Sequence, residues 1–259
     1  MARVLEAPAA ENLDSLREDF VTACKILAHE GVTEAAFNVS VRLPGERMMA
    51  IPITSPNLVT KDNLKIWSLN EPVDDWKAHP AIYEARADVG AIVHVHPPYA
   101  VAFSTLNQPF EPIHHYGAPF HGKLAMYRSP GQTGTVDRAK DIARQLGDNR
   151  VILQQGHGST MVGKDLREAV LLTIYLEESL KILTIARQMG KPEILALELS
   201  QKITGQILKP RSQVKAWEHY AAKVGRQKPR QNSKTLCSGT VFALHQPNAT
   251  GGDAREPLI

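Results

Sequence analysis

The sequence predicts an α/β fold in which a single domain has a central mixed β-sheet flanked by helices. Apolar residues recur at intervals of three and four in several long stretches, which is the spacing of amphipathic helices. Short apolar runs typical of strands lie between these stretches, and some of them are separated by tight-turn residues, which predicts hairpins. The 259 residues, 43% of them hydrophobic, are ordinary for a globular domain.

The first half of the chain predicts helices and strands in alternation. A helix over about 13–30 has an apolar face, formed by Leu13, Leu16, Phe20, Cys24 and Leu27, and Gly31 ends it. Strands over 37–42 and 48–54 form a hairpin around Pro44 and Gly45, a loop follows at 55–57, and a short turn is expected around Leu64. A helix after Pro80 and a strand over 91–96 come next.

The second half predicts mostly helices. One helix begins at Pro98 and ends near Leu106, and residues 107–131 are a loop with short strands. Thr133 or Thr135 begins a helix that Gly147 ends, and strands follow at 151–153 and 160–162. Two or three helices are then expected, at about 165–189, 193–207 and 211–224. We expect residues 1–12 to be a flexible lead and residues 226–259 to be a tail or an arm laid on a neighbouring subunit.

Composition argues against several classes of function. The net charge of +3 is small, and the basic residues are concentrated only in the stretch from Lys223 to Lys234, so nucleic-acid binding is not expected. No apolar run approaches the ~20 residues of a membrane span, and the first residues lack a signal-peptide core. The two cysteines, Cys24 and Cys237, lack the spacing of metal ligands and suggest a reducing compartment. We therefore expect a cytoplasmic protein that binds neither nucleic acid nor membrane.

Two histidines in the strand over 91–96 indicate a metal site. His94 and His96 are two residues apart, so their side chains point to the same face of a strand. Two imidazoles on one face can hold one divalent metal ion. The alternative is that both are incidental strand histidines. His157, which lies between two glycines after a buried strand, is the natural third ligand, and three imidazoles with open positions make a catalytic site.

Other polar residues are candidates for proton transfer. Asp75 precedes the helix after Pro80 and could be a fourth ligand, an acid or base, or only a helix cap. His79 and His115 are alternative proton donors, although the pair His114 and His115 is also suited to a wall or an interface.

Several segments together resemble the class II aldolase/adducin family. They are residues 79–96 (HPAIYEARADVGAIVHVH), residues 38–42, the loop 53–56, and the Gly-His-Gly at 156–158 followed by Val162 and Gly163. The resemblance covers about residues 13–225. It implies a mixed, largely antiparallel sheet between helices, a homotetramer, and one divalent metal ion per subunit on His94, His96 and His157 near a subunit boundary. Zinc or manganese is expected, with iron or cobalt as alternatives, and Asp75 matches the position of the family's catalytic acid.

Three departures from the family pattern concern the substrate. The sugar-phosphate aldolases hold phosphate with a Gly-Asn turn, a Ser-Gly turn and a Ser-Ser pair, and this chain has Phe37-Asn38, Asn57-Leu58 and Val73-Asp74 at those places. Larger side chains and the negative charge of Asp74 replace the glycine backbone and the serine hydroxyls that donate hydrogen bonds to a phosphate. We therefore expect an unphosphorylated, more apolar or planar substrate. Residues 175–179 and 216–220 resemble the family branch that contains metal-dependent decarboxylases of hydroxylated aromatic or heteroaromatic acids.

The leading hypothesis is therefore a metal-dependent lyase that decarboxylates a small hydroxylated aromatic or heteroaromatic carboxylic acid. An aldolase acting on an unphosphorylated hydroxy-ketone or hydroxy-acid, a non-haem iron oxygenase and a non-enzymatic adducin-like scaffold are the alternatives. Expected substrate-binding residues are Asn38, Ser55, Tyr99, Arg128, Trp217 and Tyr220. Trp217 and Tyr220 are equally compatible with simple packing, and Arg128 would hold a carboxylate through two hydrogen bonds.

Overall fold

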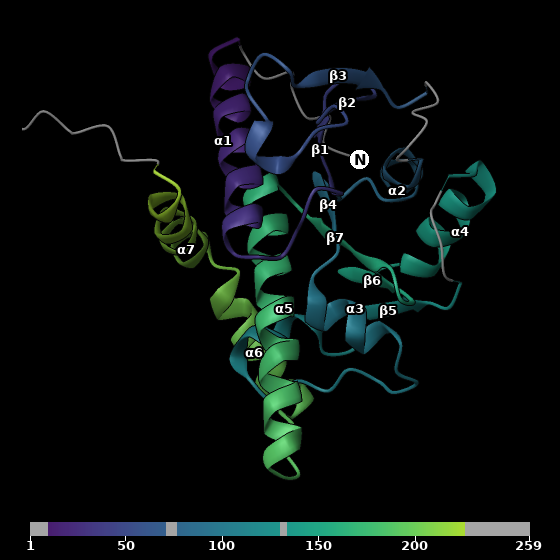
Figure 1. Ribbon diagram of the computed structural model, residues 1–259, viewed down its shortest axis with the longest axis vertical. Helices are drawn as coiled ribbons and strands as arrows, with labels where there is room; N and C mark the ends of the chain where they lie inside the picture. Colours follow the sequence, from purple (N-terminus) through teal and green to yellow (C-terminus); the bar gives the residue numbers. More distant parts are fainter. Residues whose placement is uncertain (1–9, 71–76, 130–133, 226–259) are drawn as a thin grey trace, which may run out of the picture. The chain divides into compact units, whose positions relative to one another are not determined.

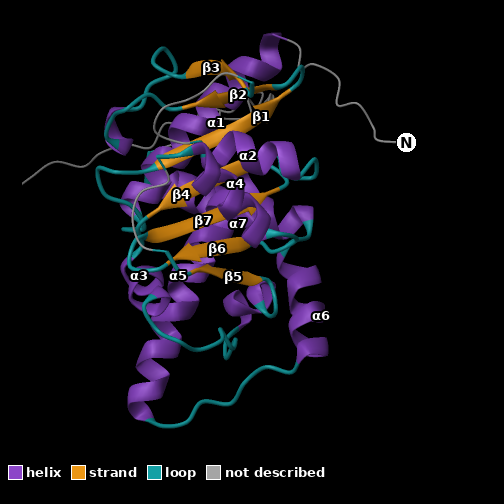
Figure 2. Cartoon of the chain, turned by 90° about the vertical axis from the view of Figure 1, so that its right-hand side faces the viewer, coloured by secondary structure: helices purple, strands orange, loops and turns teal. Residues whose placement is uncertain are grey.

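A seven-stranded sheet lies at the centre of the computed structural model, which describes residues 10–70, 77–129 and 134–225. Within these residues the strand order is β3-β2-β1-β4-β7-β6-β5 (Figure 2). Neighbouring strands are antiparallel except for β5 and β6, which are parallel. The prediction of a mixed, largely antiparallel sheet is confirmed. In chain order the strands are β1 (Asn38–Leu43), β2 (Arg47–Ala50), β3 (Lys65–Ser68), β4 (Ala91–Val95), β5 (Leu124–Tyr127), β6 (Val151–Gln154) and β7 (Gly158–Gly163).

Helices cover both faces of the sheet. Figure 1 shows α1 and α5 on one side and α2 and α4 on the other. None of the helices in the described ranges is long and apolar enough to cross a membrane. The α-helices are α1 (Ala10–His29), α2 (Ala78–Ala85), α3 (Pro98–Ser104), α4 (Val136–Leu146), α5 (Leu166–Met189), α6 (Leu197–Ile207) and α7 (Pro210–Lys223), and η1 (Pro56–Leu58) and η2 (His115–Phe120) are short 3₁₀ helices.

Local signals in the sequence explain several helix ends. The Thr135 side chain accepts a hydrogen bond from the backbone N–H of Arg138 and begins α4, and Asp165 does the same for α5 with the N–H of Glu168. Gly31, after α1, has φ = +67°, which glycine adopts at little cost. These side chains provide hydrogen-bond partners for backbone groups that a helix end would otherwise leave unpaired.

The structure corrects two expectations and adds one strand. The turn expected near Leu64 is present at residues 61–63, and residues 65–68 after it form the edge strand β3, which was not predicted and which pairs with β2. The helix α2 begins at Ala78, before Pro80, since a proline in the first helical turn removes no intrahelical hydrogen bond. Strand β2 ends at Ala50 rather than near Thr54. Each difference concerns a boundary or a short edge element, where local patterns carry little information.

The apolar faces predicted for the helices are buried in one core. On α1 the side chains of Phe20, Cys24 and Leu27 are fully buried, and burial raises the pKa of the Cys24 thiol. On α5 the packing includes Leu172, Leu176, Leu180 and Leu183, and this helix contacts β4 and β7. The core therefore fixes the two strands on which the candidate site is built.

Strand directions bring the ends of β4 and β6 to the same edge of the sheet. Both strands are antiparallel to β7, which lies between them, so they are parallel to each other. The two-histidine segment leaves the end of β4, and the turn that contains His157 leaves the end of β6. The topology thus places segments about 60 residues apart side by side.

Candidate metal centre

His94, His96 and His157 converge at the end of β4. His94 lies in the strand, His96 directly after its last residue, and His157 in the turn between β6 and β7. The ligand atoms that they offer all lie within 4.8 Å of one another, and the ring centroids are 5.0–5.2 Å apart. An ion with four nitrogen or oxygen ligands at about 2.0–2.1 Å spaces them roughly 3.3 Å apart, so small side-chain rotations bring the three imidazoles onto one ion. The residues present fit a divalent metal.

The two glycines beside His157 have different roles in this geometry. Gly156 has φ = +64°, a left-handed conformation, and its N–H donates to the hydroxyl of Ser104 at 2.8 Å. A Cβ on Gly158 would lie 2.5 Å from the carbonyl oxygen of Val95 and 2.6 Å from the His96 ring. Glycine at 156 therefore allows the turn, and glycine at 158 allows β7 to approach His96.

A row of polar side chains across three strands orients His94. Asn38 on β1 and Thr160 on β7 both lie directly opposite His94, so the three side chains share one face of the sheet. The Nδ1 of His94 is 2.9 Å from the Thr160 hydroxyl, which also accepts from the amide nitrogen of Gln154 at 3.2 Å. With Nδ1 engaged in this way, Nε2 of His94 is the nitrogen available to a metal.

The electrostatic environment favours the neutral form of His94 and His96. Burial, followed by the nearby imidazoles of His96 and His157, lowers the pKa of His94 well below its usual value. Burial and then His157 also lower the pKa of His96, although the backbone of Ala36 and the carboxylate of Glu34 act in the opposite direction. Neutral imidazole is the form that binds metal ions, so His94 and His96 are prepared to bind a metal at neutral pH.

His79 contacts Ser40, which is two residues from Asn38 on β1 and lies on the same face of the sheet as the row. Its side chain is 2% exposed, and its Nδ1 is 2.8 Å from the hydroxyl of Ser40, which is 2.9 Å from the hydroxyl of Tyr83. Burial lowers the pKa of His79 to about 3, so the ring is neutral at physiological pH. This environment suits a positioning role better than delivery of a proton, the role predicted from the sequence.

Of the other predicted residues, the structure brings Asn38 to the histidines. Asp75 lies outside the described residues. Tyr99 is in the first turn of α3, where its N–H donates to a carboxylate oxygen of Glu177 at 2.8 Å. Ser55 precedes η1, and its carbonyl accepts from the N–H of Leu58 at 2.9 Å. Nothing in the described contacts joins Ser55 to the three histidines, so its substrate-binding role stays a prediction.

Arg128 and Trp217 have partners elsewhere. The guanidinium of Arg128 donates to the carbonyl of Leu106 at 3.0 Å and lines a separate cavity of about 360 Å³. Trp217 is 3% exposed, and the guanidinium of Arg167 lies 5.3 Å from the centroid of its ring. Of the two readings of Trp217 that the sequence left open, the structure supports packing.

His115 and Tyr220 belong to an aromatic cluster apart from the three histidines. The His115 ring is 4.1 Å from Tyr116, which stacks on Tyr175 with centroids 4.1 Å apart and planes at 4°. Tyr116, Tyr175 and Tyr220 line a cavity of about 480 Å³ together with His219. Burial raises the pKa of Tyr220 to about 12, and the neighbouring Tyr116 acts in the same direction. The sequence signal for this cluster is the concentration of His and Tyr between Pro112 and Pro119.

Sequence reasoning missed three side chains that support the site. The Thr160 hydroxyl contacts Nδ1 of His94, and the amide nitrogen of Gln154 donates to Thr160 and lies 3.5 Å from the same Nδ1. Glu177, on α5, accepts hydrogen bonds from the N–H groups of Tyr99 and Ala100 at 2.8 and 2.9 Å, so it fixes the helix that follows His96. Burial raises the pKa of the Glu177 carboxyl. None of these contacts has a local sequence motif, because each depends on which strands and helices are neighbours.

Curated proteins related in sequence include aldolases and a decarboxylase. The chain is 25% identical over 198 residues to a 5-methylthioribulose-1-phosphate/5-deoxyribulose-1-phosphate aldolase of Rhodospirillum rubrum, which covers 73% of this chain and 89% of that protein. It is 30% identical over 143 residues to the decarboxylase NovR of Streptomyces niveus, covering 55% of this chain and 52% of NovR.

The fold has a close counterpart among solved structures, and a family model matches most of the domain. The L-fuculose 1-phosphate aldolase of Glaciozyma antarctica superposes with a TM-score of 0.71 at 22% identity, over 85% of this chain and 93% of that one. Residues 18–184 match the model of the class II aldolase and adducin N-terminal domain, and this range contains the three histidines. The chain therefore belongs to the class II aldolase and adducin family.

Proposed function

We propose that this protein is a metal-dependent carbon–carbon lyase that decarboxylates a small hydroxylated aromatic or heteroaromatic carboxylic acid. The observation that carries the proposal is the convergence of His94, His96 and His157 within 4.8 Å in a chain of a lyase family. We infer one divalent ion per chain, zinc or manganese, with iron or cobalt as alternatives. Bound there, the ion supplies Lewis-acid polarisation of a phenolate or carbonyl oxygen next to the carboxylate that leaves.

The chain's own residues hold the substrate and move one proton. Asn38 lies in the row with His94, where its amide can hydrogen bond to an oxygen of the substrate. When the bond between the ring carbon and the carboxylate breaks, CO₂ leaves and the electron pair stays on that carbon. We assign to Asp75, in its acid form, the transfer of a proton to the same carbon, which leaves a carboxylate to be reprotonated from water.

Two observations favour an unphosphorylated substrate. Phe37 stands at the position of the glycine in the Gly-Asn turn with which the sugar-phosphate aldolases hold phosphate. Its side chain is 5% exposed and is packed in the core. Leu58 is 65% exposed and brings an apolar side chain to the place of a second phosphate-binding turn. The relation to NovR over about half of that protein is consistent with a decarboxylase.

An aldolase that cleaves an unphosphorylated hydroxy-ketone or hydroxy-acid is the second candidate. The names of the relatives favour the aldol cleavage itself, because they include a methylthioribulose phosphate aldolase and several L-fuculose phosphate aldolases, but each of these names specifies a phosphorylated substrate. The same three histidines and the same carboxylate, Asp75, would serve this reaction. The two candidates differ in the bond that breaks and therefore in the product.

We also propose a homotetramer in the cytoplasm, with the candidate site near a subunit boundary. Large apolar side chains are exposed at the end of α5 and the beginning of α6, among them Met189 (85%) and Leu199 (45%). Exposed apolar surface of this kind favours burial against another chain.

Product analysis with the metal-loaded enzyme tests the proposal. Hydroxybenzoates and hydroxypyridine carboxylates are incubated with the enzyme, and CO₂ release and oxygen uptake are measured. The proposal expects CO₂ without oxygen consumption, and loss of release in H94A. Pyruvate or glycolaldehyde from hydroxy-acids or hydroxy-ketones would select the aldolase, oxygen uptake would select an oxygenase, and a protein without any turnover would select the scaffold.

A further inference from the structure

A second cavity lies at the opposite edge of the sheet from the three histidines. It has a volume of about 610 Å³ and is formed by the segments that precede β4, β5 and β6 and by one face of α6. Because β4, β5 and β6 are parallel to one another, their starts share one edge and their ends share the other. From Arg150, before β6, to Gln154, at its end, four residue steps span on the order of 13 Å.

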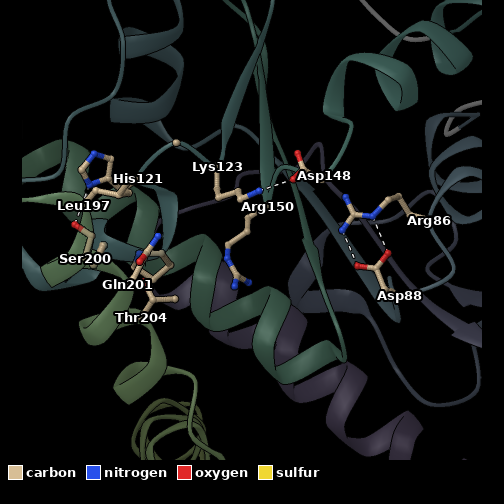
Figure 3. A pocket seen from close by; sticks show the side chains of 13 residues that line it. Arg86, Asp88, His121, Lys123, Asp148, Arg150, Leu197, Ser200, Gln201 and Thr204 are labelled. Carbon is tan, nitrogen blue, oxygen red and sulfur yellow. Dashed lines mark hydrogen bonds and ion pairs between the residues drawn. The ribbon is translucent and has the colours of Figure 1, made fainter.

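Three cationic side chains line this cavity, and two of them are paired. Arg86 donates to both carboxylate oxygens of Asp88 at 2.7 Å, and the ammonium of Lys123 is 2.5 Å from Asp148 (Figure 3). The carboxylates of Asp88 and Asp148 are 68% and 84% exposed, so they lie at the rim in contact with water. The carboxylates of Asp88 and Asp148 are therefore already paired with the cations of Arg86 and Lys123.

Arg150 is the third cation, and it lacks such a partner. In the described part of the chain its guanidinium donates no hydrogen bond, and its ion pair with Glu168 is long, at 4.0 Å. The Glu168 carboxylate is already held by the amide of Gln213 at 2.8 Å and by Lys164, whose ammonium is 3.4 Å away. The Arg150 side chain is only 30% exposed, so its charge is partly removed from water without a close counter-ion.

Neutral hydrogen-bonding groups complete the wall on α6. Ser200, Gln201 and Thr204 come from one face of this helix, because residues three and four apart lie on the same side. The Ser200 hydroxyl is 2.9 Å from Nδ1 of His121. Figure 3 shows the Arg150 side chain between these α6 residues and the Arg86–Asp88 pair. An occupant of the cavity thus meets one charged donor and several neutral ones.

We propose that this cavity binds a small organic anion that carries a phosphate or carboxylate group, with Arg150 as its principal ligand. A guanidinium whose nearest carboxylate is 4.0 Å away, beyond hydrogen-bond distance, is suited to two parallel hydrogen bonds with an oxyanion, and hydroxyl and amide groups satisfy the remaining oxygens. The volume lies within the range of small-molecule sites, and the formal charge of the five ionic side chains is +1. A cation is excluded because it would add positive charge next to Arg150. This site does not depend on the metal or on the proposed lyase activity.

Calorimetric titration of the full-length protein tests the inference. The probes are phenyl phosphate, inorganic phosphate and benzoate, added at constant ionic strength to protein treated with EDTA, so that no metal at the histidines recruits the anion. We expect phenyl phosphate or benzoate to bind the wild type and R150Q to weaken that binding on the order of tenfold, the loss of one charge-assisted contact. T204E, which brings a carboxylate into the cavity from α6, should weaken it as well.

R144Q is the matched control, because Arg144 is an exposed arginine on α4 that pairs with Asp141 away from the cavity. It should leave binding within about twofold of wild type. Tighter binding of phenyl phosphate than of benzoate identifies a phosphate site, and the reverse identifies a carboxylate site. The inference is overturned if none of the probes binds, or if folded R150Q and T204E bind as the wild type does. Circular dichroism of each variant establishes that it is folded.

Discussion

At the scale of the residue, the candidate site depends on His94 and on the hydroxyl of Thr160, 2.9 Å from its Nδ1, that orients it. The alternation of His94 with His96 and the glycines around His157 are local patterns, so the three candidate ligands could be predicted without a structure. Thr160 and Gln154, which orient His94, could not be predicted in this way. Thr160 is opposite His94 only because β4 and β7 pair in one particular register. Such a register is a property of the whole sheet and has no local signature.

The hydroxyl of Thr160 should matter for metal affinity. T160V keeps the shape of the side chain but removes the partner of the His94 Nδ1, which is 2.9 Å away. Loss of such a supporting contact weakens metal binding by about ten- to a hundredfold in related situations. Competition with a chromogenic chelator measures the change. The control is T173V, since the buried Thr173 hydroxyl donates only to a carbonyl within α5. Equal affinities of both variants would contradict the assigned role of Thr160.

His79 should make the stability of the metal-free protein depend on pH. Its pKa is lowered from an ordinary value of 6.5 to about 3, so between these values the unfolded chain binds more protons at this residue than the folded one. The contribution of His79 to the free energy of unfolding is complete above pH 6.5 and is lost as the pH falls toward 3. Between these values the free energy of unfolding decreases by about 1 kcal/mol for each pH unit.

H79N preserves a partner for Ser40 but cannot titrate. Urea denaturation between pH 4 and 7 should give a flatter dependence of the unfolding free energy for H79N than for the wild type. Parallel curves for the two proteins would show that His79 is not the group responsible.

At the scale of the element, the two glycines beside His157, between β6 and β7, look alike in sequence but have different surroundings in the structure. A Cβ at Gly158 would collide with the Val95 carbonyl and the His96 ring, whereas a Cβ at Gly156 would meet no atom within 4 Å. We expect G156A to cost about 1 kcal/mol of stability through its left-handed backbone alone. G158A should cost more and should also displace His96.

Differential scanning calorimetry and metal titration of this pair of variants distinguish the two roles. The expected outcome is a much lower metal affinity in G158A and a nearly unchanged affinity in G156A. A G158A protein with the stability and metal affinity of G156A would contradict the close approach of β7 to His96.

Elements were predicted best where they are long and periodic. The helices α4 and α5 were predicted close to their observed bounds, and Thr135, one of the two residues expected to begin α4, is its cap. Strand β3 was missed because four residues at a sheet edge show little alternation and are held by their pairing with β2. The order of the strands follows from long-range pairing of this kind and was not predicted, because the family resemblance implied only the type of sheet.

At the scale of the whole molecule, three of the predicted catalytic and substrate-binding residues lie in two separate places. Asn38 lies with the three histidines, while His115 and Tyr220 lie in the aromatic cluster, and no described contact joins that cluster to the histidines within one chain. A neighbouring chain that supplies the cluster would reconcile both predictions, as expected for a site at a subunit boundary. Sequence could not show this, because patterns do not reveal which chain contributes a residue.

Mixing of inactive subunits tests that arrangement. H94A removes a metal ligand and Y220A removes part of the aromatic cluster, so each homo-oligomer should lose most of its activity. If Tyr220 acts across the boundary, oligomers reassembled from both variants should regain activity, because some sites then combine an intact His94 with an intact Tyr220. Light scattering should show tetramers for all samples. Mixtures as inactive as the separate variants would contradict this arrangement. Tyr220 would then serve the site of its own chain or would not belong to the site at all.

The most direct test of the central claim is the metal content of the protein. Wild-type protein is stripped with EDTA, incubated with zinc or manganese, freed of excess metal by gel filtration and analysed by mass spectrometry. The geometry of His94, His96 and His157 leads us to expect about one ion per chain in the wild type and close to none in H94A or H157A. A variant that keeps the wild-type metal content while remaining folded would contradict the claim that these three histidines form the metal centre.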